Sequence, residues 1–273
     1  MGNSISKSYL LYLLPLFIIS LFAIACQNCT STNAENKSSK SNNSVNKVVT
    51  KDSVSKEYLL GKVNPVTDAH FITVDQKYAS RKGFYLRKEA YDAFVKMYDA
   101  ALKDGIKLSI LSAFRSFNEQ KEIWEGKWTG KVLYYGKNIA SSYPDPVERS
   151  KYVLKYSSMP GTSRHHWGTD MDMNSLELSY YKTDAGKKLY KWLTDNAFKF
   201  GFCQPYTAKD TARTNGYEEE KWHWSYLPLS LIYLQQYKDK ISYDDLVGFA
   251  GCETARKIDI IKSYVLSVNK KCQ

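Results

Sequence analysis

The block of residues 163–172, SRHHWGTDMD, constrains the fold of this chain more than any other stretch. It contains two of the four histidines, and a third, His223, follows later in the chain. A catalytic zinc site needs three nitrogen or oxygen ligands from the protein and one position left open for water. His165, Asp172 and His223 can supply two imidazoles and a carboxylate. The chain is therefore expected to bring them together, with Glu220 as a spare carboxylate that takes a proton from the activated water.

Three segments resemble the signature of a zinc peptidase family. The family pattern reads Ser-x-x-Arg-Ser-x-x-x-Gln, then Ser-x-His-x-x-Gly-x-Ala-x-Asp, then Glu-x-Trp-His. The chain has these segments in the same order at residues 112–120, 163–172 and 220–223. The family is that of the D-alanyl-D-alanine carboxypeptidases of the vancomycin-resistance type, related to lysostaphin and hedgehog domains. The chain departs from the pattern at Asp170, where the family usually has Ala, and this extra carboxylate leaves the identity of the oxygen ligand open.

The resemblance implies a fold, a metal and a reaction. The fold is α+β, with a small antiparallel sheet that carries a Zn²⁺ site and helices that flank the sheet. The reaction is the hydrolysis of the C-terminal D-Ala from peptidoglycan stem peptides, which are then the expected partner. The ligands are His165, Asp172 and His223.

Two adjacent histidines compete for the metal. Side chains of neighbouring residues in an extended segment point apart, so only one is expected to bind. The spacing of the family pattern selects His165, because the matching partner of His166 would be Met173, a poor zinc ligand. His166 and Trp167 are then expected to line the cleft, or His166 to support the ligands from behind.

Further residues of the three segments are assigned to the reaction. Arg115 carries a permanent charge on a planar fork, and it is expected either to stabilise the oxyanion or to bind the terminal carboxylate. Glu220 and His223 are three residues apart and would face opposite sides of a regular strand. Glu220 is therefore expected in a turn or bulge before that strand. The remaining candidates for holding the substrate are Ser112, Gln120, Ser163 and Trp222.

Other functions share these residues. An L,D-carboxypeptidase, a dipeptidase or an endopeptidase would use the same ligands and differ in the walls of the cleft. A non-catalytic peptidoglycan-binding module could keep the zinc but would lack the base, whereas Glu220 is present. The net charge of +11 comes from scattered lysines without an RNA-binding signature, so no nucleic-acid partner is expected. The charge fits an anionic cell envelope, and we expect a monomer.

The N-terminus is typical of an export signal. Lys7 precedes an apolar run over residues 9–25, and residues 23–26 (AIAC) resemble a bacterial lipobox. We therefore predict a signal peptide at residues 1–25 and a lipid on Cys26, which would attach the protein to a membrane in the extracytoplasmic cell envelope. A plain cleaved signal and a single membrane anchor are the alternatives.

A linker and a single folded domain are predicted after the signal. Residues 26–57 are rich in Ser, Asn and Lys and poor in large apolar residues, which predicts a flexible segment. The zinc carboxypeptidase domain is then expected at 58–273. In an oxidising compartment its cysteines can pair; Cys252 and Cys272 bracket the last predicted helix, but on one straight helix they would lie ~30 Å apart. A bridge between them needs a sharp return of the tail, and the pairing of Cys29 and Cys203 stays open.

Hydrophobic periodicity predicts the elements of this domain. Alternating apolar residues over 106–110 predict a half-buried strand that leads to Ser112. Ser116 and Asp145 are the predicted N-caps of two helices on either side of a long loop at 127–144. A helix at 86–102 is predicted from a stripe at helical spacing: Ala90, Phe94, Met97 and Ala101. Strands are expected at 170–174 and 222–226, a helix between them from 183 to 201, and helices at 229–239, 242–250 and 253–268.

Overall fold

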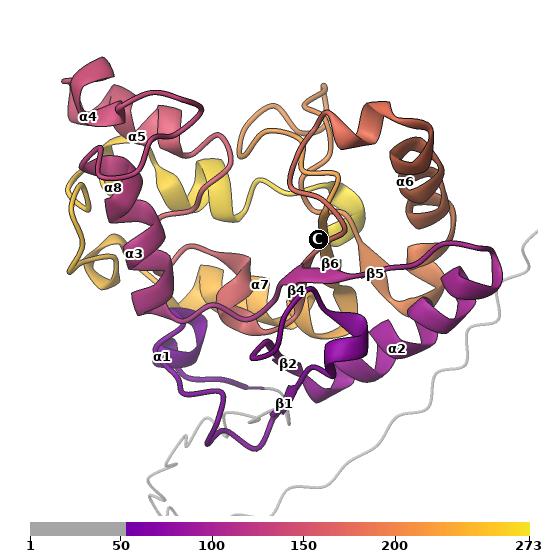
Figure 1. Ribbon diagram of the computed structural model, residues 1–273. Helices are drawn as coiled ribbons and strands as arrows, with labels where there is room; N and C mark the ends of the chain where they lie inside the picture. The colour runs from indigo at the N-terminus through magenta and orange to yellow at the C-terminus, as the bar shows by residue number, and fades with distance from the viewer. Residues whose placement is uncertain (1–52) are drawn as a thin grey trace, which may run out of the picture. The chain divides into compact units, whose positions relative to one another are not determined.

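The computed structural model describes residues 53–273 (Figure 1). The predicted signal peptide, Cys26 and most of the predicted linker lie outside the described residues. The first helix, α1 (Lys56–Leu59), begins within the last residues of that linker, with Ser55 as its N-cap. In the part of the chain that the structure describes, no helix is both long and apolar enough to cross a membrane.

A four-stranded antiparallel sheet and flanking helices make up the fold, which is the α+β architecture expected. The strand order is β3 (Ile110–Ser112), β4 (Asp170–Met173), β6 (His223–Tyr226) and β5 (Phe202–Cys203). A separate antiparallel pair joins β1 (Phe71–Thr73) to β2 (Tyr85–Arg87). Figure 1 shows α2 and α6 to the right of the sheet and α3, α5 and α8 together to its left.

The helices differ widely in length. The α-helices after α1 are α2 (Lys88–Lys103), α3 (Phe117–Trp128), α4 (Ile139–Ser142), α5 (Pro146–Val153), α6 (Asp184–Asn196), α7 (Leu227–Lys240) and α8 (Thr254–Lys257). The 3-10 turns are η1 (Gln76–Tyr78), η2 (Arg164–Trp167), η3 (Tyr180–Lys182), η4 (Ala197–Phe200), η5 (Tyr243–Asp245) and η7 (Lys270–Cys272), and η6 (Ile261–Val265) is a π-helical turn.

Helix α2 packs on the apolar face of β4, through Met171 and Met173. Because side chains alternate along a strand, this packing turns Asp170 and Asp172 to the other face. Burial of a large apolar side chain stabilises the fold by ~1.5–3 kcal/mol, so this contact fixes β4 firmly. The helix contributes the predicted stripe, which is fully buried: Ala90, Phe94, Met97 and Ala101.

Strand β3 is shorter than the sequence pattern predicted. Ile106, Leu108 and Ile110 are buried as the alternation indicates. Only residues from Ile110 onward pair with β4, and the register shifts between Ile110 and Ser112. The reason is the end of the partner strand, since Asn174 adopts a φ of +63° and ends β4 at Met173.

The helix caps follow the sequence. Ser116 and Glu119 form a capping box at the start of α3, in which the Ser116 Oγ accepts from the Glu119 N–H at 3.2 Å. The Asp145 carboxylate accepts from the Glu148 N–H at 2.9 Å, and Pro146 occupies the first turn of α5. A cap of this kind is worth ~1 kcal/mol. The predicted loop between these helices is shortened by the end of α3 and by α4.

The C-terminal helices after α7 are broken where the sequence analysis expected continuous ones. Gly248 adopts a φ of +88°, which interrupts the helix predicted at 242–250, and Gly251, at φ +82°, follows directly after that range. Asp259, at φ +52°, separates α8 from η6 within the helix predicted at 253–268. The tail returns to the sheet, where Cys272 forms a disulfide with Cys203 of β5 rather than with Cys252, whose thiol is free.

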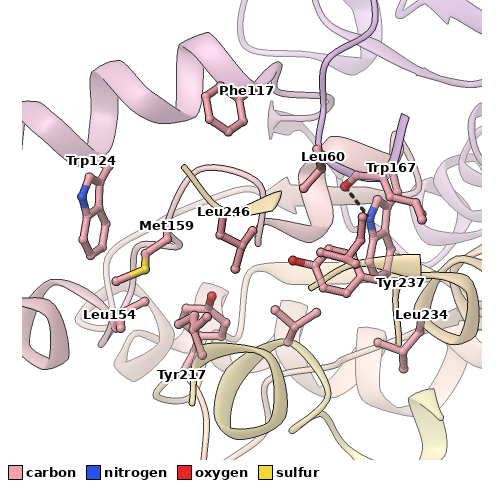
Figure 2. Close-up of a cluster of buried hydrophobic side chains, with 14 of the residues drawn as sticks. Leu60, Phe117, Trp124, Leu154, Met159, Trp167, Tyr217, Leu234, Tyr237 and Leu246 are labelled. Atoms are coloured by element: carbon pink, nitrogen blue, oxygen red, sulfur yellow. Dashed lines mark hydrogen bonds between the residues drawn. The ribbon is translucent and has the colours of Figure 1, made fainter. Parts of the chain in front are cut away.

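A second hydrophobic cluster packs beneath the segment that leads to the 163–172 block (Figure 2). Its labelled members include Met159, which precedes the block, Trp124 of α3 and Tyr237 of α7. The Tyr237 hydroxyl donates to the Gly161 carbonyl at 2.8 Å, and the Trp167 indole N–H donates to the Leu59 carbonyl at 3.3 Å. These buried hydrogen bonds hold the backbone just before the block and the Trp167 side chain within it.

Candidate active site

The three predicted ligands meet at one end of the sheet. Asp172 on β4 is the register partner of His223 on β6, and His165 comes from η2, which precedes β4. One ligand atom from each residue lies within 4.8 Å of the other two, and all three side chains are buried. His165 Nε2 is 3.2 Å from Asp172 Oδ2, and His223 Nδ1 is 3.2 Å from Asp172 Oδ1.

Hydrogen bonds from the far side of each ring fix which nitrogen faces this centre. His165 Nδ1 lies 2.7 Å from the Ala113 carbonyl, which can only accept, so Nδ1 carries the proton and Nε2 is free. His223 Nε2 lies 2.9 Å from Asp170 Oδ1, which leaves Nδ1 free. Burial and the charge of Arg115 lower the pKa of His165 and favour the neutral ring that a metal requires.

The donor set fits a divalent cation such as zinc. Asp172 Oδ1 is a buried oxygen without a hydrogen-bond partner among the described residues. An unpaired buried oxygen costs free energy, and this carboxylate places one oxygen 3.2 Å from a ring nitrogen of each histidine. Two imidazoles and one carboxylate, with an open side towards a cleft, are the ligands of a catalytic zinc site.

Glu220 lies in the turn before β6, where the spacing required it. Its carbonyl accepts from the His223 N–H at 3.3 Å, so the chain reverses between the two residues. This turn brings Glu220 Oε2 to 3.3 Å from His223 Nδ1, although the two side chains are three positions apart. Burial raises the pKa of the Glu220 carboxyl above its ordinary value. The side chain lines the cleft beside the three ligands.

Arg115 reaches the same centre from the start of α3. Its Nη2 lies 3.6 Å from Asp172 Oδ2, and its Nη1 donates to Gln120 Oε1 at 2.8 Å. Gln120 in turn donates to the Ser158 carbonyl at 2.8 Å, and its side chain is fully buried. Both ends of the Gln120 amide are therefore occupied, and the residue holds Arg115 instead of lining the cleft as the sequence analysis expected.

The comparisons with known proteins agree with this geometry. Residues 83–229 match the family described as VanY, D-alanyl-D-alanine carboxypeptidase. The chain belongs to this family. The match covers more than half of the chain and contains every residue assigned above to the candidate site.

Curated relatives and solved structures resemble the same region. The putative carboxypeptidase YodJ of Bacillus subtilis (strain 168) is 33% identical over 181 residues, which cover 64% of this chain and 58% of YodJ. A D-alanyl-D-alanine carboxypeptidase of Enterococcus faecalis (strain ATCC 700802 / V583) is 27% identical over 169 residues, 62% of this chain and 57% of that protein. The chain thus spans little more than half the length of these relatives.

The structure of the LdcB LD-carboxypeptidase is 26% identical with a TM-score of 0.45, covering 64% of this chain and 79% of that one. VanYB in complex with D-alanine-D-alanine is 22% identical with a TM-score of 0.46, covering 64% and 91%.

Asp170, the departure from the family pattern, faces away from the ligand centre. Its Oδ1 accepts from His223 Nε2 and from Arg164 Nε, each at 2.9 Å, and its Oδ2 accepts from the Thr169 hydroxyl at 2.6 Å. Burial raises the pKa of this carboxyl, but the charge of Arg164 and the hydrogen bond from His223 outweigh it and hold the carboxylate ionised. Both oxygens are thus occupied, which leaves Asp172 as the carboxylate that faces the centre.

Neither His166 nor Trp167 lines the cleft, so that expectation was wrong for both, whereas the alternative for His166, a supporting place behind the ligands, agrees with the structure. His166 is fully buried; its Nδ1 donates to the Arg115 carbonyl at 2.7 Å and its Nε2 accepts from the Gly161 N–H at 3.0 Å. Burial lowers the pKa of His166 to about 3, so the ring stays neutral. Trp167 lies in the hydrophobic cluster of Figure 2. His166 therefore ties the 161–166 segment to the backbone of Arg115.

The ligands open onto a cleft of about 1040 Å³. Of the predicted substrate residues, Ser112, Ser163 and Trp222 line it. The Ser163 Oγ also accepts from the His165 N–H at 3.3 Å and so supports the ligand turn. Other residues that line the cleft were not predicted from the sequence. They come from the long loop and from three later segments: Lys127, Tyr134, Tyr135, Tyr156, Leu176 and Tyr206. The unusual density of Tyr over 127–144 was the available signal.

Proposed function

We propose that the chain is a zinc-dependent D-alanyl-D-alanine carboxypeptidase that removes the C-terminal D-Ala from peptidoglycan stem peptides. The observation that carries this proposal is the convergence of His165, Asp172 and His223 in a buried centre, with Glu220 beside it in the cleft. Membership of the carboxypeptidase family supports the reaction class. The presence of Glu220 favours an enzyme over a binding module.

The three ligands would hold the zinc, and Glu220 would move the protons. When bound, zinc supplies a Lewis acid that makes water nucleophilic near neutral pH and polarises a carbonyl. The Glu220 carboxylate lies 3.3 Å from a ligand nitrogen, within reach of a water at the open position. It would take one proton from that water and give it to the nitrogen of the departing D-Ala.

Arg115 would stabilise negative charge on the scissile carbonyl oxygen. Its guanidinium is fixed by Gln120 and lies 3.6 Å from a ligand oxygen, so it stands beside the reacting bond. Arg115 Nε is buried without a hydrogen-bond partner among the described residues, and the guanidinium keeps donor capacity for a ligand. Donors placed before the reaction where charge develops are commonly the largest catalytic contribution.

Hydrolysis of defined muropeptides tests this proposal. The purified zinc-loaded protein is incubated with a stem peptide that ends in D-Ala-D-Ala and with one that ends in an L-residue followed by D-Ala. Mass spectrometry should show loss of one D-Ala from the first peptide only. Loss from the second peptide alone would assign the protein as an L,D-carboxypeptidase, and cleavage inside either peptide would make it an endopeptidase.

We further propose that the protein is an envelope lipoprotein attached through Cys26. The lipobox-like sequence at 23–26 supports it, and the Cys203–Cys272 disulfide is typical of an oxidising compartment. Cys26→Ser should move the protein from the detergent phase to the soluble envelope fraction in a phase-partition experiment. Unchanged partitioning would mean that the apolar run is itself the anchor.

A further inference from the structure

Two cations that line the cleft, Lys127 and Arg81, form no ion pair among the described residues, and Arg81 donates only to the Lys82 carbonyl. Lys127 lies in the last turn of α3, is half-buried and lines the cleft. Its Nζ stands 4.5 Å from the centroid of the Tyr134 ring. Among the described residues, no hydrogen bond or ion pair engages this ammonium group. Lys121, on the same helix, instead lies 3.9 Å from Glu125 and outside the cleft.

An unpaired ammonium in this position is unfavourable without a ligand. Burial, together with the charge of Arg115, lowers the pKa of Lys127 to about 8, while Glu220 acts in the opposite direction. The charged form is therefore less favourable than that of an exposed lysine, and an incoming anion would stabilise it. Arg115 and Glu220 line the same cleft as Lys127, and the charges of both influence its pKa.

A peptide cut at its last bond presents two negative groups to the cleft. One is the oxygen of the scissile carbonyl as it reacts, and the other is the free α-carboxylate, about one residue or ~3.8 Å further along the chain. Arg115 is fixed against Asp172 and Gln120, so it suits the first group. Among the described residues, the contact of Lys127 is with the Tyr134 ring and not with a candidate ligand. Lys127 therefore suits the second group, the α-carboxylate. Arg81, the remaining cleft cation apart from the histidines, is exposed and lies over Phe84.

We propose that Lys127 binds the free C-terminal carboxylate of the peptide substrate and so restricts cleavage to chain ends. The Tyr134 ring holds the ammonium in the cleft wall, and Arg115 is left to serve the carbonyl oxygen. The inference rests on the proposed function, because it names the group by which that site recognises its substrate. Lys127 is a specificity residue and takes no part in moving protons.

The test compares two substrates that differ only in the terminal group. A stem peptide ending in D-Ala-D-Ala is supplied as the free acid and as the C-terminal amide, and kcat/KM is measured for each. The parent protein should prefer the acid by about 10- to 100-fold, the range expected for hydrogen bonds to charged groups. Lys127→Met should remove this preference by raising KM for the acid, with kcat for the amide unchanged. Lys127→Arg should retain it, and Lys121→Met is the matched surface control.

Two outcomes overturn the inference. The first is an acid-to-amide ratio in Lys127→Met equal to that of the parent, and the second is loss of the preference in Arg81→Met instead. Lys127→Gln replaces Lys127→Met if the latter does not fold. A parent protein that cleaves neither substrate contradicts the proposed function, and calorimetric binding of the acid and amide peptides then tests Lys127 independently. Equal affinity of parent and Lys127→Met for the acid would refute the inference in that case too.

Discussion

The cleft has two parts that are built in different ways. We call the part formed by the three candidate ligands the metal half, and the part formed by the end of α3 and the loop after it the outer wall. His165, Asp172 and His223 stand on or beside a sheet whose opposite face is filled by α2, and each ring is fixed by a buried acceptor. The outer wall comes from the end of α3 and the loop that follows, where Tyr135 is 59% exposed and Lys127 lacks a counter-ion. Under the proposed function, the difference assigns the chemistry to the sheet and the choice of substrate to the loop.

Loss of a ligand should have the largest effect, and it should be confined to the metal half. Asp172→Ala removes the carboxylate among the three candidate ligands, so stoichiometric zinc binding should be lost. His166→Ala should keep its zinc, because both ring nitrogens bind backbone groups, although it leaves these groups unpaired at a cost of ~1–3 kcal/mol each. Metal analysis and thermal unfolding of both variants measure this. Equal loss of zinc in both would show that the choice between the adjacent histidines is wrong.

Glu220→Gln should separate catalysis from metal binding. The amide keeps the size of the side chain but has no basicity, and general acid–base catalysis is worth ~10²–10⁴-fold. We expect turnover to fall at least a hundredfold, the lower end of that range, with zinc content and peptide affinity close to those of the parent. Steady-state kinetics beside metal analysis and calorimetry give the three quantities. Turnover within a few-fold of the parent would remove Glu220 as the base.

Asp170 allows a finer comparison within the metal half. Residues that orient a metal-binding imidazole typically change metal affinity by ~10–100-fold when altered, so Asp170→Asn should weaken zinc binding by this amount. It also leaves Arg164 charged and buried without a carboxylate. Thr169→Val is the matched control, since it removes a hydrogen bond to the other oxygen and keeps the charge. Competition with a zinc chelator measures both, and equal affinities in the two variants would contradict an orienting role for Asp170.

The same division explains what could be predicted from the sequence. The ligands, the caps at Ser116 and Asp145 and the stripe of α2 depend on local spacing, and the structure places them as expected. The Cys203–Cys272 pair depends on where the tail returns, and the burial of Gln120 depends on a carbonyl 38 residues away. Whether the Lys127 ammonium forms an ion pair depends on which carboxylates the fold brings near it, and among the described residues none does. Contacts of this kind follow from tertiary packing and leave no local pattern.

The smallest expected effect concerns the outer wall and is measured by pH. The groups that face Lys127 are Arg115 from the start of α3, Glu220 from the turn before β6 and the Tyr134 ring from the loop. Since the pKa of Lys127 is lowered to about 8, its charge is present below that pH and is lost as the pH rises through it. The carboxylate of the peptide is ionised throughout this range.

The acid-to-amide ratio of kcat/KM should therefore be constant up to about pH 7 and fall about tenfold by pH 9, because kcat/KM reports the pKa values of the free enzyme. Lys127→Arg supplies the control, since a guanidinium stays charged at every pH used. Its ratio should not change with pH. The use of a ratio cancels the titration of Glu220 and of the zinc site, which affect both substrates alike. A ratio that is constant to pH 9.5 in the parent, or that falls equally in Lys127→Arg, would assign the carboxylate to another cation of the cleft.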